Sequence, residues 1–307
     1  MTLIKKTAIE IYRFLMPKLQ ALSPRLWAKL QYRYVYGKPC HLSRPRTFSE
    51  KLLWLWLNTY RGNPTIMRLC DKYEVREYIK ECGFDDILNE LYFVTDDPSS
   101  IRYEDLPGQF VLKLSQGWNT NLLCKNKEDL QPHTLRDFLH QCSQGNYFYD
   151  IGAARIGGVK RKELHKHYIC ERYLSDESQS IPIDYKVYCF HGQPKAILYI
   201  AGRFKQKKGC FMSPEWDYQG CLNDTYQRMI TPPERPPHLS QMLEYASKLS
   251  APFPFVRVDF YDIGGKLIFG EMTFFPNGCI GMQETSVGGH AMTELLQLDI
   301  GYQKRRM

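Results

Sequence analysis

Apolar and polar positions alternate with a period of two over residues 255–275, on both sides of a Gly-Gly pair. Before the pair, valine and phenylalanine alternate with charged residues, and a second alternating run follows it. A period of two around a glycine turn is typical of a β-hairpin. The pattern predicts that Arg257 and Asp259 share a face of the first strand and that Glu271 and Thr273 share a face of the second.

Two carboxylates on neighbouring strands have a chemical consequence. If the strand register sets Asp259 opposite Glu271, the like charges destabilise the sheet unless a cation lies between them. An oxygen-rich pair beside Arg257 is typical of Mg²⁺ bound together with phosphate oxygens. The alternative is a solvated strand face that carries ordinary surface charges, and the hairpin alone leaves both interpretations open.

Helical and strand periods both occur in the rest of the chain, which predicts an α+β protein. The predicted helices cover residues 24–36, 47–57, 72–81, 132–142, 239–249 and 289–298, and the predicted strands cover 91–94, 110–114, 122–124, 168–174, 184–190 and 195–200. A capping box at residues 47–50 opens the second helix. Asp71 can cap the third helix, where Lys72 and Arg76 form an i, i+4 pair that we interpret as solvated.

Lysines interrupt two of the predicted strands. Lys113 lies in the middle of the apolar run 110–114, and a buried lysine needs an anion. The loop that follows it can present backbone N–H groups to a phosphate, although it lacks the Walker sequence. Lys186 shares a strand face with Asp184 and Tyr188. Each signal is weak on its own.

Composition limits the classes of function. The chain has 307 residues, 43% hydrophobic and 24% charged, which is enough for two domains. A formal net charge of +8 points to anionic partners such as nucleotides, phosphorylated sugars or a membrane surface. No RNP-like string occurs, so nucleic acid is not an expected partner. The ten cysteines include no C-x-x-C pair, which favours a reducing cytoplasm.

The amino-terminal residues 1–38 combine helical periodicity with many basic side chains. No apolar run approaches the roughly 18 residues that a spanning helix needs. Basic charge beside tryptophan and tyrosine suits peripheral contact with an anionic membrane. The alternative is a helical pair packed on its own domain with a solvated basic face.

Several motifs occur together in one order. They are Phe48-x-Glu50-Lys51-Leu52, Asp71-Lys72-Tyr73-x-Val75-Arg76-Glu77-Tyr78, Asp184-Tyr185-Lys186-x-Tyr188-x-Phe190-x-Gly192, Phe255-x-Arg257-Val258-Asp259 and Phe269-Gly270-Glu271-x-Thr273-Phe274. Over residues of about 45 to 300 they resemble the TupA-like (teichuronopeptide-synthesis type) ATP-grasp family of surface-polysaccharide gene clusters.

The resemblance implies an ATP-grasp fold, in which two α+β lobes grip a nucleotide. It suggests an amino-terminal basic, amphipathic helical region over residues 1–60, a first lobe over 61–165, and a second lobe with the metal-binding hairpin over 166–307. The implied ligands are ATP and Mg²⁺.

The resemblance also implies residue roles. Lys113 and Lys186 would contact the nucleotide phosphates, Gln116, Gly117 and Asn119 would form the phosphate loop, and Glu171, Tyr173 and Leu174 would lie at the adenine. Asp259, Glu271 and Thr273 would hold the metal, and Arg257, Lys186 and Arg203 would serve catalysis. This set suits phosphoryl transfer, which depends on positioning and charge neutralisation.

The implied activity is a carboxylate-amine ligase that forms an acyl phosphate and releases ADP. Its substrates would be a uronic-acid sugar and an amino acid or amine, in capsule, O-antigen or cell-wall polysaccharide synthesis. A transferase, either a sugar kinase or a glycosyltransferase, and a nucleotide-binding scaffold are the alternatives. Buried like charges without a ligand would be a liability, which argues against the scaffold.

Overall fold

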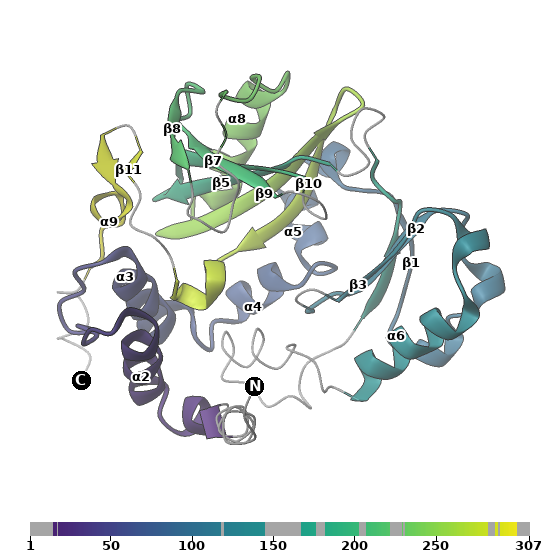
Figure 1. The fold of residues 1–307 in the computed structure, drawn as a ribbon, viewed down its shortest axis with the longest axis horizontal. Helices are drawn as coiled ribbons and strands as arrows, with labels where there is room; N and C mark the ends of the chain where they lie inside the picture. The colour runs from purple at the N-terminus through teal and green to yellow at the C-terminus, as the bar shows by residue number, and fades with distance from the viewer. Residues whose placement is uncertain are drawn as a thin grey trace.

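A computed structural model describes residues 15–16, 18–117, 120–144, 167–175, 182–202, 207–221, 229, 231–281, 286–287 and 289–299. Two antiparallel sheets dominate this part of the chain, with strand orders β1-β4-β2-β3 and β10-β9-β5-β6-β7-β8. Figure 1 shows β1, β2 and β3 on the right beside α6, and the second sheet at the upper left between α8 above and α4 and α5 below. The α+β prediction is confirmed.

The four-stranded sheet has one buried apolar face. Its strands are β1 (Leu91–Thr95), β2 (Phe110–Leu114), β3 (Asn121–Cys124) and β4 (Tyr168–Glu171), and α6 spans Pro132–Gln144. Phe110, Leu112 and Leu114 are buried in a core with Leu135 of α6. Lys113 alternates with them and therefore points away from that core. Because β4 pairs with β1 and β2, this sheet extends past the predicted lobe boundary at residue 165.

The six-stranded sheet contains the predicted hairpins. Its strands are β5 (Asp184–Phe190), β6 (Gln193–Ala201), β7 (Lys208–Met212), β8 (Tyr218–Cys221), β9 (Phe255–Ile263) and β10 (Lys266–Thr273). The sequence did not predict β7 and β8. Both are short and each contains a glycine, Gly209 or Gly220, which weakens the strand signal.

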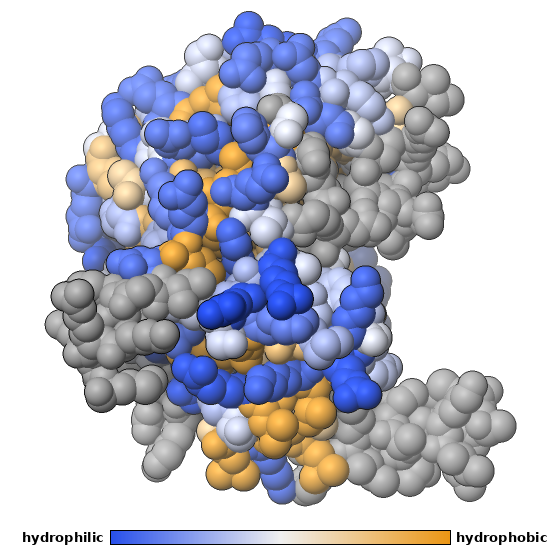
Figure 2. Space-filling model, turned by 90° about the vertical axis from the view of Figure 1, so that its left-hand side faces the viewer, coloured by the Kyte–Doolittle hydropathy of each residue, from blue (hydrophilic) through white to orange (hydrophobic). Residues whose placement is uncertain are grey.

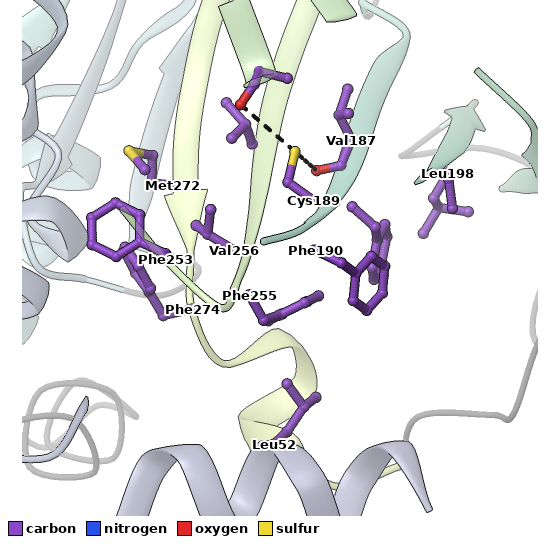
Figure 3. Close-up of a cluster of buried hydrophobic side chains, with 14 of the residues drawn as sticks. Leu52, Val187, Cys189, Phe190, Leu198, Phe253, Phe255, Val256, Met272 and Phe274 are labelled. Atoms are coloured by element: carbon purple, nitrogen blue, oxygen red, sulfur yellow. Dashed lines mark hydrogen bonds between the residues drawn. The ribbon is translucent and has the colours of Figure 1, made fainter. Parts of the chain in front are cut away.

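The six-stranded sheet has an apolar face and a face that carries charged side chains. Val187 and Cys189 of β5 lie on the face that packs against α8 (Leu239–Ser250), where the Cys189 thiol is 3.7 Å from the Ala246 carbonyl. Figure 3 shows this contact among buried apolar side chains, with Leu52 reaching in from α3. Residues that alternate with Val187 and Cys189 face the other way, and the charged ones among them build the site.

The amino-terminal helices pack onto one end of that sheet. They are α2 (Pro24–Tyr36) and α3 (Phe48–Leu55), and α3 continues as a π-helix, η1 (Trp56–Tyr60). The predicted capping box is confirmed, since Thr47 Oγ1 accepts the Glu50 N–H and the Glu50 carboxylate accepts the Thr47 N–H. Glu50 is buried and also accepts hydrogen bonds from His41 and Arg46. The motif Phe48-x-Glu50-Lys51-Leu52 therefore stabilises the start of α3.

Two shorter helices, α4 (Pro64–Cys70) and α5 (Val75–Glu81), connect the amino-terminal part to the sheets. The helix predicted from residue 72 begins three residues later, because Asp71 Oδ1 accepts the N–H groups of Tyr73 and Glu74 in a turn. Short helices follow at η2 (Asp85–Ile87), η3 (Pro98–Ser100), η4 (Tyr103–Asp105), η5 (Lys127–Asp129) and η7 (Pro276–Cys279).

The predicted helix over 289–298 is wrong for most of its length. The described residues there form β11 (Ser286–Val287), β12 (His290–Ala291) and α9 (Met292–Leu295). Lys51 Nζ donates to the Thr293 and Leu296 carbonyls, which ties this short helix to α3. In the part of the chain that the structure covers, no helix combines the length and apolarity needed to cross a bilayer.

Candidate active site

The hairpin β9-β10 brings the two predicted carboxylates together. Asp259 pairs with Glu271 across the strands, and Arg257 pairs with Thr273. The register that the sequence left open is therefore the one that creates a two-carboxylate site.

A β-bulge at Gly270 sets this register. Phe269 pairs with Phe260 and Glu271 pairs with Asp259, so Gly270 is the extra residue. Without the bulge, strict alternation would turn Glu271 toward the apolar face. A Cβ atom at Gly270 would lie 3.0 Å from the Asp259 carbonyl oxygen. Glycine is needed here because the two strands approach so closely.

Arg257 organises the acidic residues. Its guanidinium binds Asp259 through Nε at 2.6 Å and through Nη2 at 2.7 Å. Nη2 also lies 3.1 Å from Glu271 Oε1 and 3.0 Å from Thr273 Oγ1. The Thr273 hydroxyl in turn donates to Glu271 Oε1 at 3.0 Å. A cation therefore lies between the two carboxylates, as their repulsion requires.

Lys186 completes the group from the neighbouring strand. It pairs with Asp259 in the register of β5 and β9, and its ammonium group forms an ion pair with Asp259 Oδ2. Asp184 lies 3.7 Å from the same ammonium group. We call Lys186, Arg257, Asp259, Glu271 and Thr273 the Asp259 cluster.

Burial decides between the two interpretations of this face. Asp259 is 2% exposed, Lys186 7% and Arg257 9%. The interpretation as a solvated strand face with ordinary surface charges is therefore wrong, because ordinary surface charges stay in water.

The charges of the cluster shift the acid–base behaviour of its members. Burial by itself would raise the pKa of Glu271, but the charges of Arg257, Lys72 and Lys186 outweigh it and lower that pKa to about 2. Burial likewise opposes the charged form of Arg257, and the charge of Asp259 overcomes this and raises the Arg257 pKa. Glu271 is thus held ionised, and its side chain, which is 42% exposed, remains open to solvent.

A second group of charges forms on the other sheet around Glu171. Lys113 Nζ lies 2.7 Å from Glu171 Oε2, and Arg76 lies 3.4 Å from Oε1. Asn89 donates to Glu171 at 3.4 Å and accepts, through its carbonyl, from Arg76 at 2.8 Å. We call Arg76, Asn89, Lys113 and Glu171 the Glu171 cluster. The anion predicted for Lys113 is Glu171 in this structure.

Lys72 and Arg76 correct the sequence analysis. Their interpretation as a solvated pair is wrong: the Arg76 side chain is 15% exposed and pairs with Glu171, and burial lowers the pKa of Lys72. The charges of Glu271 and Lys113 both act on Lys72, in opposite directions. Their place in the Asp71-Lys72-Tyr73 motif was the one signal that could have identified them, because charge spacing on a helix does not reveal a distant partner.

Four of the six remaining predicted site residues lie in the part of the chain that the structure describes. Gln116 and Gly117 lie in the turn that follows β2, and the Gly117 N–H donates to the Leu114 carbonyl at 3.1 Å. Tyr173 and Leu174 are half-buried in the segment after Glu171. Asn119 and Arg203 lie outside the described residues.

The oxygen donors suit magnesium. Asp259 and Glu271 supply hard carboxylate oxygens from adjacent strands, and Mg²⁺ takes one or two carboxylates together with water and phosphate oxygens. In the described part of the chain no group of three or more His, Cys, Asp or Glu residues gathers to form a metal cage. The two carboxylates by themselves fit the one or two that Mg²⁺ takes from a protein.

A model of the TupA-like ATPgrasp family matches residues 50–286. The chain belongs to the TupA-like ATP-grasp family. The fold is an ATP-grasp fold, with helices and antiparallel sheets preceded by an amino-terminal helical region. No curated protein sequence matches the chain.

Solved structures of ATP-grasp proteins match over part of their length. The ATP-grasp ligase PsnB complexed with a minimal precursor is 14% identical, with a TM-score of 0.38, over 74% of this chain and 60% of its own. D-alanine–D-alanine ligase from Bacillus anthracis complexed with ATP is 12% identical, with a TM-score of 0.41, over 68% of this chain and 57% of its own. The chain thus spans about 60% of these proteins.

Proposed function

We propose that this protein is an ATP-dependent carboxylate-amine ligase that forms a C–N bond and releases ADP and phosphate. The observation that carries the proposal is the Asp259 cluster, in which two carboxylates, an arginine and a lysine converge on one buried face of the second lobe. Membership in the ATP-grasp family supports the same reading.

In this proposal the chain supplies charge and position. Asp259 and Glu271 would hold Mg²⁺, with Thr273 as a candidate third ligand, and the ion would neutralise charge on the ATP phosphates. Lys113 and Lys186 would bind phosphate oxygens, and Arg257 and Arg203 would stabilise the phosphoryl group in transfer. Phosphoryl transfer requires such positioning and neutralisation rather than covalent help from the protein.

The ion pairs of the Asp259 and Glu171 clusters fit this role. Lys113 is bound to Glu171, and Lys186 and Arg257 are bound to Asp259. A buried cation without a partner would destabilise the fold. The carboxylates would therefore keep the phosphate-binding cations paired and oriented. Gln116, Gly117 and Asn119 would close over the phosphates, with Tyr173 and Leu174 beside the adenine.

We propose a uronic-acid sugar as the carboxylate substrate and an amino acid or other amine as its partner, in bacterial surface-polysaccharide synthesis. The carboxylate would attack the γ-phosphate of ATP to give an acyl phosphate, and the amine would displace phosphate to form an amide. The family resemblance supports this substrate class.

The test is to incubate the purified protein with Mg-ATP, a uronic-acid sugar and pooled amino acids, and to follow ADP, phosphate and product mass. A ligase forms an amide only when all three substrates are present. Formation of a phosphorylated sugar without an amine would indicate a sugar kinase instead, and a new glycosidic bond would indicate a glycosyltransferase. The Asp259→Asn variant is the control for contaminating ATPases.

We further propose that the enzyme works in the cytoplasm, in peripheral contact with the membrane through residues 1–38. Residues 11–49 contain eight lysines and arginines and no acidic residue, so the rest of the chain holds 33 basic and 33 acidic residues. The whole formal net charge of +8 is therefore carried by this segment. Such a segment is attracted to anionic lipid.

Helix α2 has an exposed face that suits contact with an anionic membrane. Trp27, Ala28, Gln31 and Tyr32 are buried, whereas Leu26 is 47% exposed, Leu30 43% and Tyr34 77%. These three form an i, i+4 row, and Arg25, Lys29 and Arg33 form a second exposed row beside it. Figure 2 shows apolar side chains gathered at the bottom of this side of the molecule, at the level of α2 in Figure 1.

Vesicle sedimentation tests this contact. We expect the full chain to bind anionic vesicles at low salt and to be released at high salt, and Lys29→Glu/Arg33→Glu to bind much less. The charge-matched control is Lys248→Glu/Lys266→Glu, which changes two lysines of α8 and β10 outside residues 1–38. Equal binding by both double variants, or none by the wild type, would contradict the proposal.

A further inference from the structure

Tyr60 binds the first residue of β9 through its hydroxyl group. The hydroxyl donates to the Phe255 carbonyl at 2.7 Å and accepts the Phe255 N–H at 3.1 Å. Tyr60 is 1% exposed, so both bonds are shielded from water. Burial also raises the pKa of Tyr60, which keeps the hydroxyl protonated as a donor. One side chain from the amino-terminal part of the chain thus satisfies two backbone groups of a hairpin strand.

These two bonds take the place of a strand partner. β10 ends where Thr273 pairs with Arg257, so the register of the two strands leaves Phe255 beyond the end of β10. On the other side of β9, the Pro254 carbonyl accepts an N–H at 3.0 Å from the turn that follows β5. Because neighbouring carbonyls of a strand point in opposite directions, the polar groups of Phe255 face the side that β10 has left. The tyrosine hydroxyl therefore substitutes for the next β10 residue.

The ring of Tyr60 contacts the other strand of the hairpin. Its centroid lies 5.5 Å from that of Phe274 and 5.6 Å from that of Phe275, and both contacts are edge-to-face. These two phenylalanines directly follow Thr273, the last residue of β10. Figure 3 shows Phe255 and Phe274 at this end of the hairpin. Tyr60 therefore joins the start of β9 to the end of β10.

The backbone that carries Tyr60 is a π-turn. Tyr60 is the last residue of η1, where the Arg61 N–H donates at 2.9 Å to the Trp56 carbonyl, five residues back. An α-helix closes its turns over four residues, so this turn contains one residue more and changes the direction of the side chains that follow. Such turns occur frequently at functional sites. Here the π-turn lies where the amino-terminal helices contact the hairpin.

We propose that Tyr60 is a positioning residue for the Asp259 cluster. This inference rests on the proposed metal-dependent function and names a residue that holds the metal-binding hairpin in shape. Arg257 and Thr273 form the last pair of the hairpin, and the ends of paired strands open most readily. Both belong to the cluster, and the Arg257 guanidinium lies 3.0 Å from the Thr273 hydroxyl. By bridging the strands just beyond this pair, Tyr60 keeps the oxygens of Thr273 and Glu271 in place for the proposed magnesium ion.

The variant Tyr60→Phe removes the hydroxyl and keeps the ring. We expect the Mg²⁺ concentration for half-maximal ATP turnover to rise about 10-fold or more, as for other residues that orient metal ligands. Without any nucleotide, the amides at the start of β9 should exchange with deuterium about tenfold faster, because the Phe255 N–H loses its acceptor. Turnover at varied Mg²⁺ and hydrogen-exchange mass spectrometry measure the two effects.

Tyr103→Phe is the matched control. The Tyr103 hydroxyl donates to the Lys127 carbonyl at 2.6 Å, and its ring packs against the core of the four-stranded sheet. This variant also loses a hydrogen bond to the backbone, but it should leave the Mg²⁺ dependence and the exchange of β9 unchanged.

Three outcomes contradict different parts of the proposal. Wild-type Mg²⁺ dependence in Tyr60→Phe, or an equal rise in both variants, would overturn the positioning role. Unchanged exchange at the start of β9 would overturn the bridging contact itself. A wild-type protein without Mg²⁺-dependent ATP turnover would overturn the proposed function, and the exchange rates of β9 would still decide whether Tyr60 holds the hairpin closed.

Discussion

Lys186, Asp259 and Glu271 lie side by side on adjacent strands of the six-stranded sheet, whereas Glu171 on the four-stranded sheet collects Lys113, Arg76 and Asn89 from three separate segments. The Asp259 cluster follows from strand pairing alone, because neighbours in register share a face. The Glu171 cluster requires a helix and a connecting loop to dock on the sheet. The first arrangement depends on strand register, including the bulge at Gly270, and the second depends on how a helix and a loop dock on the sheet.

The two clusters also differ in how tightly their charges are held. Asp259 is 2% exposed and bound by two cations, while the side chains of Arg76 and Lys113 are 15% and 18% exposed. Removal of one ion-pair partner should therefore lower the free energy of unfolding more in the Asp259 cluster than in the Glu171 cluster, because water can reach and solvate the cations of the Glu171 cluster.

The largest effect is expected for Asp259→Asn. The variant leaves Lys186 and Arg257 buried without their carboxylate, which should lower the free energy of unfolding by about 3–5 kcal/mol. Loss of the proposed metal ligand should reduce ATP turnover at least about a hundredfold. Urea unfolding and ADP release measure the two effects, with Glu244→Gln, which changes an exposed residue of α8, as control. Wild-type stability would show that the ion pairs of this cluster contribute little.

Lys113→Met tests the Glu171 cluster. We expect ATP affinity to fall about 10- to 100-fold, as for a lost charged hydrogen bond, with a loss of stability well below that of Asp259→Asn. Glu171 keeps Arg76 and Asn89 as partners in the variant. Nucleotide titration and urea unfolding check this. A stability loss equal to that of Asp259→Asn would remove the contrast between the clusters.

Gly270→Ala tests the bulge that orients Glu271. The new Cβ would lie 3.0 Å from the Asp259 carbonyl oxygen, so the strands must shift, at an expected cost of about 1–3 kcal/mol. The matched control is Gly108→Ala, where an added Cβ meets nothing within 4 Å. Thermal unfolding of both variants gives the comparison. If the two behave alike, the close strand approach does not constrain this position.

The smallest effect is the acid dependence of stability due to Glu271. Its pKa is lowered to about 2 in the folded protein, against about 4.3 in an unfolded chain. The folded state therefore binds fewer protons, and the stabilisation is complete above the unfolded pKa and is lost as pH falls toward 2. Urea midpoints from pH 5 to 2 should fall more steeply for the wild type than for Glu271→Gln. Equal slopes of the urea midpoint against pH in the two proteins would show that folding does not lower the pKa of Glu271.

Local sequence determined the hairpins, most strands and the capping box, since periodicity and short-range hydrogen bonds depend on neighbouring residues. It also put Arg257 and Asp259 on one strand face. Only the tertiary structure decided which face is buried, where the Gly270 bulge falls, and which acid pairs with Lys113. It also brought Lys72 and Arg76, separated from their partners by 45 and 95 residues, into the site. Such contacts form when helices dock on sheets. No local sequence pattern determines which distant residue a side chain of a docked helix will contact.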